Sequence, residues 1–234
     1  MVKCMYIKNR NDAFTLAEVL ITLGIIGIVA AITMSQVLTN MRNKGYVERM
    51  KKAYTLIQNV TIQIINEEGP PSKWILDAHG LKSQALNERV VDMYAEKMNV
   101  VKNCSGAISW IENECIFAQD GYYDLSGKPL GSNVKAFYWF GYPFVLSDGS
   151  AIIIKFLSNA GAVFWGNPDI MFIVDVNGKQ KPNKLGRDIF YFYMNGNENG
   201  QVRPYGDAQK DDCNKNDKGY TCAYKIISEG KMDY

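Results

Sequence analysis

Histidine is nearly absent from this chain of 234 residues. The single one, His79, lies beside a glycine and has no visible partner in the sequence, so we interpret it as a solvated turn residue. The chain also lacks a serine-centred glycine elbow, a phosphate-binding glycine loop and a cluster of metal ligands. We therefore expect that it is not an enzyme. An aromatic cluster at 137–140 could line a sugar or peptide groove, but core packing or a subunit contact explains it more simply.

Neither sign of charge is in excess. Lys and Arg number 26, and Asp and Glu number 24. Residues 1–13 hold three of these cations, Lys3, Lys8 and Arg10, and one of the acids, Asp12, so the rest of the chain carries 23 of each sign. A nucleic-acid-binding domain would show a basic excess, so nucleic acid is not an expected partner.

Cysteines are also few, five in all, and Cys4 lies close to the N-terminus. The other four are Cys104, Cys115, Cys213 and Cys222. An even number in an exported domain favours disulfides, and the spacing makes the first two and the last two the simplest pairs. Zinc is the alternative, but neither pair has the two-to-four-residue spacing of a zinc knuckle. The last pair would staple a polar tail.

What the chain does have is one long apolar run, Phe14 to Met34, which reads FTLAEVLITLGIIGIVAAITM. A helix of that length spans roughly 30 Å, the thickness of the hydrocarbon core of a bilayer. The run is longer than the apolar region of a secretory signal, and no convincing cleavage site for signal peptidase follows it. Its one ionisable side chain is Glu18. Because a carboxylate is costly inside a membrane, we treat Glu18 as a functional residue.

The sequence around this acid, Ala13-Phe14-Thr15-Leu16-Ala17-Glu18 after a basic leader, resembles the processing site of type IV prepilins and type II secretion pseudopilins. In that family a prepilin peptidase cuts just before the Phe and methylates the new amine. The acid at the fifth mature position then sets the register of each subunit in a helical fibre. The resemblance implies a cut between Ala13 and Phe14, although the family usually has Gly before the cut.

The role of Glu18 also follows from its position. A cut before Phe14 creates a positive amine four residues away, about 6 Å along a helix. The carboxylate could pair with its own amine or with that of a neighbouring helix, and in low dielectric such a pair strongly favours a neighbour that supplies the charge. An unpaired Glu18 would thus be relieved by assembly. The alternative is that Glu18 extends from the helix end to the headgroups.

The resemblance implies a structural subunit of a type II secretion pseudopilus or a type IV pilus, polymerised through its N-terminal helix. The implied partners are prepilin peptidase, other pilin-like subunits and a secretion or pilus assembly platform. The implied location is the bacterial inner membrane, crossed once, with the basic leader cytoplasmic and the C-terminal domain outside. The alternative is a single-pass anchored binding domain that does not polymerise.

The apolar run continues as an amphipathic helix, because apolar residues recur at three- and four-residue steps until Gly69-Pro70-Pro71 ends it. The pattern after it predicts a second helix over 83–98 and then short strands with tight turns, among them a hairpin around Asp148-Gly149. We therefore expect an α+β fold in which a long N-terminal helix packs on an antiparallel sheet. The expected strands are 142–146, 151–156, 170–174 and 189–194, and the expected divisions are 1–13, 14–34, 35–68 and 69–234.

One late stretch, 175–190, resembles the loop pattern D-x-N-G…P-N…G-x-D-x-F of many pseudopilins. In some members this region holds calcium, and oxygen ligands from Asp175, Asn177 and Asp188 would suit a hard cation. Acidic and amide side chains also serve ordinary turns by bonding the local backbone. Lysines and an arginine interrupt the loop, so we favour the turn, expect no cofactor, and keep calcium as the alternative.

Overall fold

The computed structural model describes residues 15–74, 84–104, 121–130, 141–157, 169–196 and 199–234. The chain divides into two compact units, Met1–Arg42 and Asn43–Tyr234. We call them the N-terminal unit and the C-terminal unit. Each is described by itself below.

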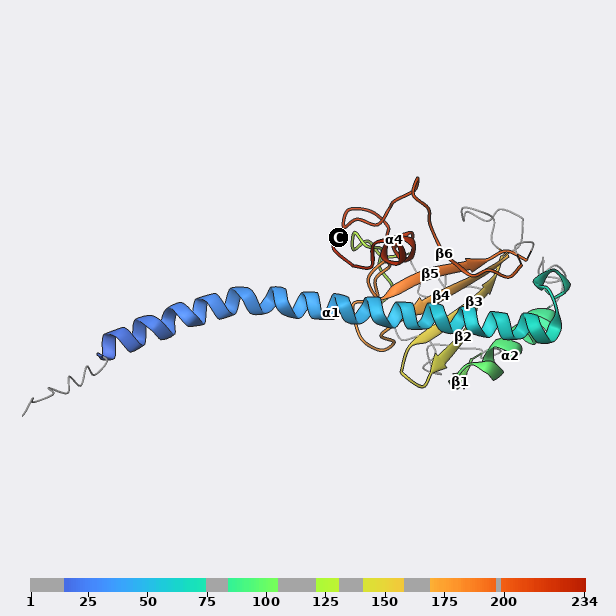
Figure 1. Cartoon of the computed structure of the whole chain (residues 1–234), viewed down its shortest axis with the longest axis horizontal. Helices are drawn as coiled ribbons and strands as arrows, with labels where there is room; N and C mark the ends of the chain where they lie inside the picture. Colours follow the sequence, from blue (N-terminus) through green and yellow to red (C-terminus); the bar gives the residue numbers. More distant parts are fainter. Residues whose placement is uncertain (1–14, 75–83, 105–120, 131–140, 158–168, 197–198) are drawn as a thin grey trace, which may run out of the picture. The chain divides into compact units, whose positions relative to one another are not determined.

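The longest element is helix α1, Leu16–Glu68, whose two parts lie in different units (Figure 1). In the C-terminal unit it buries one stripe at three- and four-residue steps, which is the pattern of an amphipathic helix. Gly69, with φ of 87°, follows its last residue, and two prolines come next. The predicted helix and its predicted end are therefore confirmed. The buried residues of α1 are Tyr46, Val47, Met50, Ala53, Ile57, Val60, Thr61 and Ile64.

A short 3-10 helix, Pro71–Lys73, and helix α2, Gln84–Lys97, come after α1. A six-stranded sheet follows, in the order β1-β2-β3-β4-β5-β6, and every neighbouring pair is antiparallel. Helix α4, Cys222–Glu229, comes last. The strands are β1 (Val100–Asn103), β2 (Gly141–Leu146), β3 (Ala151–Phe156), β4 (Ile170–Asp175), β5 (Ile189–Met194) and β6 (Arg203–Pro204).

The predicted hairpin joins β2 to β3. The Asp148 carboxylate accepts hydrogen bonds from the backbone N–H and the hydroxyl of Ser150, at 3.1 and 2.6 Å. Gly149, with φ of 81°, donates its N–H to the carbonyl of Leu146 at 3.0 Å. The turn therefore has the Asp-Gly chemistry that the sequence indicates.

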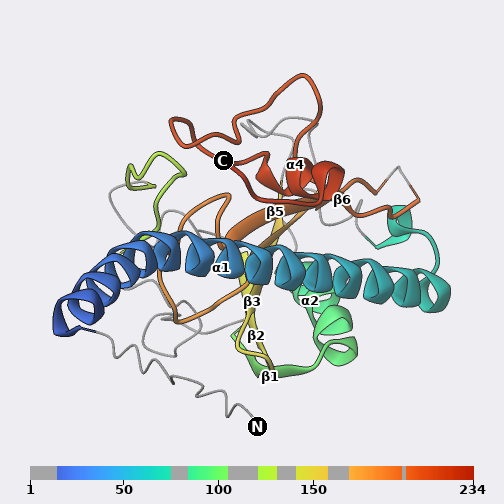
Figure 2. The same ribbon diagram turned by 60° about the vertical axis from the view of Figure 1, so that its left-hand side comes forward.

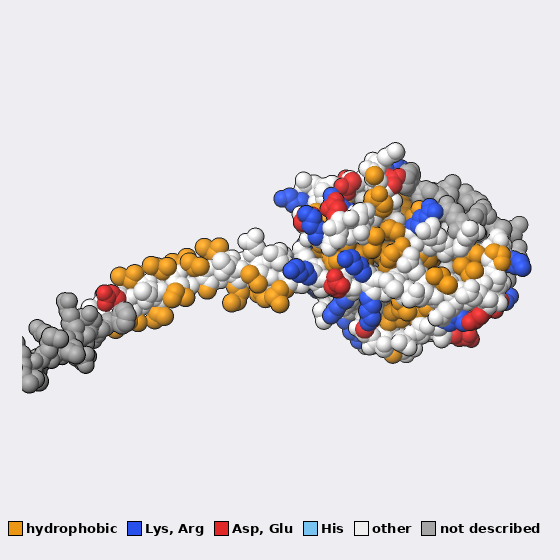
Figure 3. Space-filling model, viewed as in Figure 1, with side chains coloured by type: hydrophobic (Ala, Val, Ile, Leu, Met, Phe, Trp, Pro, Cys, Tyr) orange, Lys and Arg blue, Asp and Glu red, His pale blue; other side chains and the backbone are white. Residues whose placement is uncertain are grey.

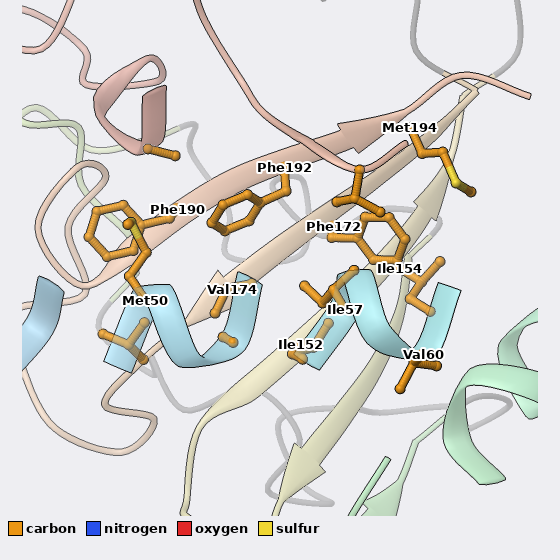
Figure 4. Close-up of a cluster of buried hydrophobic side chains, with 14 of the residues drawn as sticks. Met50, Ile57, Val60, Ile152, Ile154, Phe172, Val174, Phe190, Phe192 and Met194 are labelled. Atoms are coloured by element: carbon orange, nitrogen blue, oxygen red, sulfur yellow. The ribbon is translucent and has the colours of Figure 1, made fainter. Parts of the chain in front are cut away.

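One face of the sheet packs on α1 of the C-terminal unit, as Figures 2 and 4 show. Alternate strand residues point to this face, because side chains of a strand alternate between its two sides. The Tyr54 ring of α1 stacks on Phe192 with centroids 5.0 Å apart. The sheet residues in this cluster include Phe144, Ile152, Ile154, Phe172, Val174, Phe190, Phe192 and Met194. Together they confirm the α+β architecture, which fits a pilin-like fold.

The opposite face of the sheet has its own cluster, which includes Ile153, Met171, Ile173 and Tyr191. Both faces are therefore buried, and β4 is buried along its whole length. A strand buried on both sides reads as a continuous apolar run, and this explains why 170–174 shows no alternation in the sequence.

The tail differs from the polar end that the sequence led us to expect. Helix α4 buries Ala223 and Ile226 in the cluster under α1, and Met232 beyond it is also buried. The strand β1 was not predicted either. Its four residues alternate between half-buried and exposed, which is too short a pattern to recognise in a sequence.

Candidate functional site

In the N-terminal unit, the large apolar side chains of α1 are exposed at positions all around the helix. Figure 3 shows one face of this apolar surface in orange. Its most apolar 18-residue window has a mean hydropathy of 2.3, and none of that window is buried. Among the described residues, α1 is the one helix that is long and apolar enough to cross a membrane. A helix that is apolar all round is stable in lipid but not in water.

Glu18 lies in the first turn of this helix and is bonded to Thr15. One carboxylate oxygen of Glu18 accepts hydrogen bonds from the Thr15 backbone N–H and from the Thr15 hydroxyl, both at 2.8 Å. The Glu18 backbone N–H approaches the same hydroxyl oxygen at 3.3 Å. This arrangement is a capping box, in which Thr and Glu three residues apart satisfy the free N–H groups of a helix start.

The capping box changes one expectation. The sequence predicts that an unpaired Glu18 is relieved by assembly, whereas in the uncut chain the carboxylate is already bonded within its own first turn. Assembly would therefore exchange one set of donors for another. Ala13 and Phe14, the expected processing residues, lie outside the described residues, so the cut stays a prediction.

The C-terminal unit holds the second candidate site, in the loop between β4 and β5, which we call the 175–188 loop. Asp175 ends β4, and one of its oxygens accepts hydrogen bonds from the N–H groups of Asn177 and Gly178, at 3.2 and 2.8 Å. Asp188 precedes β5, and its two oxygens accept from the N–H groups of Asn183 and Lys184, at 2.7 and 2.6 Å. Both acids therefore shape turns, as expected.

Turn formation does not account for every oxygen in this loop. Five buried side-chain oxygens among the described residues have no hydrogen-bond partner, and three of the five belong to this loop: Oδ2 of Asp175 and the amide oxygens of Asn177 and Asn183. All three residues are less than 7% exposed. A buried acceptor without a partner is unfavourable, and such atoms call for an explanation.

The two carboxyls of the loop also influence each other. Burial raises the pKa of the Asp175 carboxyl well above its ordinary range, and the charge of Asp188 raises it further. Burial raises the pKa of Asp188 to about 6, against the lowering effect of the Lys184 and Asn183 N–H groups. Two acids that repel each other in a buried place both gain from a cation between them.

This donor set suits a hard cation. Carboxylate and amide oxygens are the ligands that calcium takes, and the loop offers three such oxygens without other partners. In the part of the chain that the structure describes, no group of three His, Cys, Asp or Glu residues could hold a metal, so the asparagine oxygens would be essential here. Asn183 is a possible ligand in addition to the three residues that the sequence predicts. Its buried amide oxygen without a hydrogen-bond partner singles it out, and this is a property of the folded chain.

The 175–188 loop is tied to both ends of the C-terminal unit. Arg187 donates a hydrogen bond to the side-chain oxygen of Asn43 at 3.2 Å, and Arg49 donates to the carbonyl of Val176 at 3.4 Å. The Tyr234 hydroxyl donates to the carbonyl of Gly186. The loop therefore connects α1 to the end of the chain.

The disulfide between Cys213 and Cys222 lies against this loop. The bond is present in the structure, with a Cα–Cα distance of 4.8 Å, as the sequence spacing predicts. Gly186 has φ of 71°, and a Cβ there would overlap Cys222 Sγ, so only glycine fits beneath the disulfide. Cys104 is buried and disulfide-bonded, but Cys115 lies outside the described residues, so their pairing stays a prediction.

Two further candidates, His79 and the aromatic cluster 137–140, also lie outside the described residues. Their interpretation as a turn residue and as a packing cluster stays a prediction.

Comparison with known proteins agrees with the first candidate site. The prokaryotic N-terminal methylation motif matches residues 8–34, so the chain carries the type IV prepilin-like signal. No curated protein and no solved structure matches the chain. The signal supports a precursor of the pilin or pseudopilin type, which is a structural subunit, and implies processing by prepilin peptidase and assembly with pilin-like subunits. Together with the apolar helix it fits a membrane-anchored pilin.

Proposed function

We propose that this chain, with its prepilin-like signal at residues 8–34, is a subunit of a type II secretion pseudopilus or a type IV pilus. The observation that carries the proposal is the signal itself, placed at the start of α1, whose most apolar window has no buried residue and whose first turn holds one acid, Glu18. Prepilin peptidase would cut before Phe14 and methylate the new amine, leaving the subunit in the inner membrane with its C-terminal unit outside.

Assembly would then move the apolar part of α1 from lipid into a bundle of like helices. In that dry environment the amine of Phe14 on one copy is a stronger partner for the Glu18 carboxylate than the neutral donors of Thr15, because both partners are charged. A copy out of register would leave one of the two charges unpaired, which is strongly unfavourable. The exchange of donors would thus set the register of the fibre.

The 175–188 loop favours the secretion-type pseudopilin over the pilus, because its pattern resembles a loop found late in many pseudopilins. We further propose that the loop binds calcium through Asp175, Asn177, Asn183 and Asp188. The three unpartnered oxygens and the raised pKa of both acids support this. A bound cation would fix the loop and, through Arg187 and Asn43, the start of α1 in the C-terminal unit.

The second candidate function is a single-pass anchored binding domain that never polymerises. Mass spectrometry of the chain recovered from membranes that also contain prepilin peptidase distinguishes the two. The subunit proposal predicts an N-terminus at Phe14 that carries one added methyl group. A chain that keeps Met1 in the presence of active peptidase would contradict it and favour the anchor.

A further inference from the structure

The charges on α1 of the C-terminal unit are segregated along the helix. The first ten residues, 43–52, hold four cations and one acid, Glu48. Residues 53–66 hold no charge, and the helix ends on two acids, Glu67 and Glu68. The cations are Lys44, Arg49, Lys51 and Lys52.

The two cations of helix α2 in the described chain form ion pairs with acids of α1. Arg89 pairs with Glu68 at 2.7 Å, and Lys97 pairs with Glu67 at 2.5 Å. Three acids of α2 remain, Glu88, Asp92 and Glu96, and steps of four residues place them on one face. Glu88 is half-buried beside Tyr142, but Asp92 and Glu96 are exposed, and neither makes an ion pair with any described residue. Like charges at this spacing repel, so α2 keeps a face that is unfavourable in the isolated subunit.

Two of the four cations of α1 have partners within the chain, and two make no ion pair. Lys52 pairs with Asp148 at 2.7 Å, and Arg49 donates to the carbonyl of Val176. Within the described part of the chain, Lys44 and Lys51 make no ion pair. They are seven residues apart, which is two turns, so they share one side of the helix.

We propose that Lys44 and Lys51 of one copy dock against Asp92 and Glu96 of the next copy of this chain. This inference rests on the proposed polymerisation and names the surface that would bring neighbouring C-terminal units together. The pairs of Glu67 and Glu68 hold α2 against the last turn of α1, whereas Lys44 and Lys51 lie in the first turns of the part of α1 that belongs to the C-terminal unit. The two surfaces are therefore about 25–35 Å apart along the helix, and one copy displaced by that amount would match them.

Such a contact joins two different surfaces of the same chain. Repeated, a contact of that kind forms an open helix rather than a closed dimer. Ile62, a large apolar side chain that is 55% exposed, supports the same geometry. It lies eighteen residues after Lys44, five full turns, so it points to the same side of α1 and would be covered by the neighbour. Charge complementarity of this type sets partner and register.

The test is charge reversal with rescue in the full-length chain, expressed with its peptidase and assembly platform. Asp92→Lys with Glu96→Lys reverses the α2 surface, and Lys44→Glu with Lys51→Glu reverses the α1 surface. We expect each pair alone to lower the yield of sheared fibres about tenfold, since it opposes like charges, and the four changes together to restore it to within about twofold. Lys215→Glu with Lys218→Glu, a matched reversal of two exposed cations in the tail, should leave the yield unchanged.

Each variant is first compared with the unmodified chain by thermal melting, because all four positions lie outside the buried core and should not alter folding. Normal fibre yield from both reversed surfaces would overturn the docking while leaving the polymerisation itself intact. A loss with the α1 reversal that the combination does not repair would assign Lys44 and Lys51 to anionic lipid headgroups, and would overturn it too. No fibres from the unmodified chain would overturn the proposed function together with this inference.

Discussion

The two parts of α1 form one continuous helix, but they differ in how much of their apolar surface is buried. In the N-terminal unit its large apolar side chains are more than 40% exposed, from Leu16 at 80% to Val19 at 42%. In the C-terminal unit it turns a single apolar stripe inward, and Met50, Ile57 and Ile64 are fully buried. Both parts are rich in large apolar side chains, but only in the second part do these side chains pack against other described residues of the chain.

This difference shows how the two parts are specified. The second part depends on shape, because its side chains must fit the sheet residues across from them. The first part depends on solvent, because lipid accepts any apolar surface and like helices can replace lipid without a new fold. The chain therefore folds with one part and, under the proposed function, assembles with the other.

The largest expected effect is on the free energy of unfolding, and it comes from replacing one isoleucine by alanine in each part of α1. Ile57→Ala opens a cavity in the core and should lower the free energy of unfolding of the C-terminal unit by about 2–5 kcal/mol. Ile25→Ala, at a position that is 59% exposed, should leave that value unchanged. Thermal or denaturant unfolding of the full chain in detergent, followed by the near-ultraviolet signal of the domain, measures both. If both variants lowered the free energy of unfolding equally, the proposed difference between the two parts of α1 would be wrong.

The sequence predicted the architecture well because its signals are local. The stripe of α1, the stop at Gly69 and the Asp-Gly hairpin each depend on a few neighbouring residues. Helix α4 and β1 were missed because they depend on distant partners. Ala223 and Ile226 are buried only because the tail returns to α1, and no short window of sequence contains that contact.

The next largest effect concerns the disulfide between Cys213 and Cys222. Cys222→Ser should lower the free energy of unfolding by about 2–3 kcal/mol, since the bond closes a loop with a separation of nine residues. Because Gly186 packs on Cys222, the same variant should weaken the response of the 175–188 loop to calcium. Titration calorimetry with calcium chloride measures this second effect. An unchanged affinity would show that the disulfide does not support the loop.

Calcium should stabilise the C-terminal unit at neutral pH. At about a hundred times its dissociation constant, it should raise the free energy of unfolding by about 2–3 kcal/mol. Both loop carboxyls have a folded-state pKa above the value of 3.8 of the free group, so without metal their contribution to stability is fully present below about pH 4 and falls as pH rises. The contribution of Asp188 is lost as pH rises through its folded-state pKa of about 6. The benefit of calcium should therefore be large at pH 7 and absent at pH 4. Melting curves at both values measure it.

Asp175→Asn sharpens that experiment. The substituted side chain keeps the oxygen that bonds Asn177 and Gly178, and it removes the charge that repels Asp188. Stability without calcium should stay the same or rise at pH 7, and the calcium response should disappear. Asp207→Asn is the matched control, because Asp207 makes the same two turn bonds, to the N–H groups of Gln209 and Lys210, at an exposed position. A full calcium response in Asp175→Asn would remove the loop as the site.

The sequence located the two acids and Asn177 in this loop but not Asn183. Nothing in the sequence distinguishes an asparagine whose side chain only stabilises a turn from one whose side-chain oxygen is directed into a buried site. That distinction depends on burial and on which hydrogen bonds remain unmade, and both are properties of the folded chain. The capping box at Glu18 was not predicted for a different reason. The Thr-x-x-Glu spacing is a known signal of a helix start, but Glu18 was interpreted only as a partner of the new amine at Phe14.

The smallest expected effect is local to the first turn of α1. Thr15→Ala removes the hydroxyl that bonds Glu18 and should destabilise the helix start by about 1 kcal/mol. Faster amide hydrogen exchange in the first turn, with unchanged exchange in the C-terminal unit, would be the readout. Unchanged exchange in both would mean that the capping box contributes nothing.

The central claim is that Glu18 sets the register of the fibre, and its removal tests that claim most directly. In cells that carry the peptidase and assembly platform, Glu18→Ala should still insert in the membrane and still be cut before Phe14, since the apolar run is intact. Its amount in sheared fibres, measured against the unmodified chain, should fall at least about tenfold, because a charge is left unpaired at every contact. Incorporation of Glu18→Ala at the unmodified level would contradict the account.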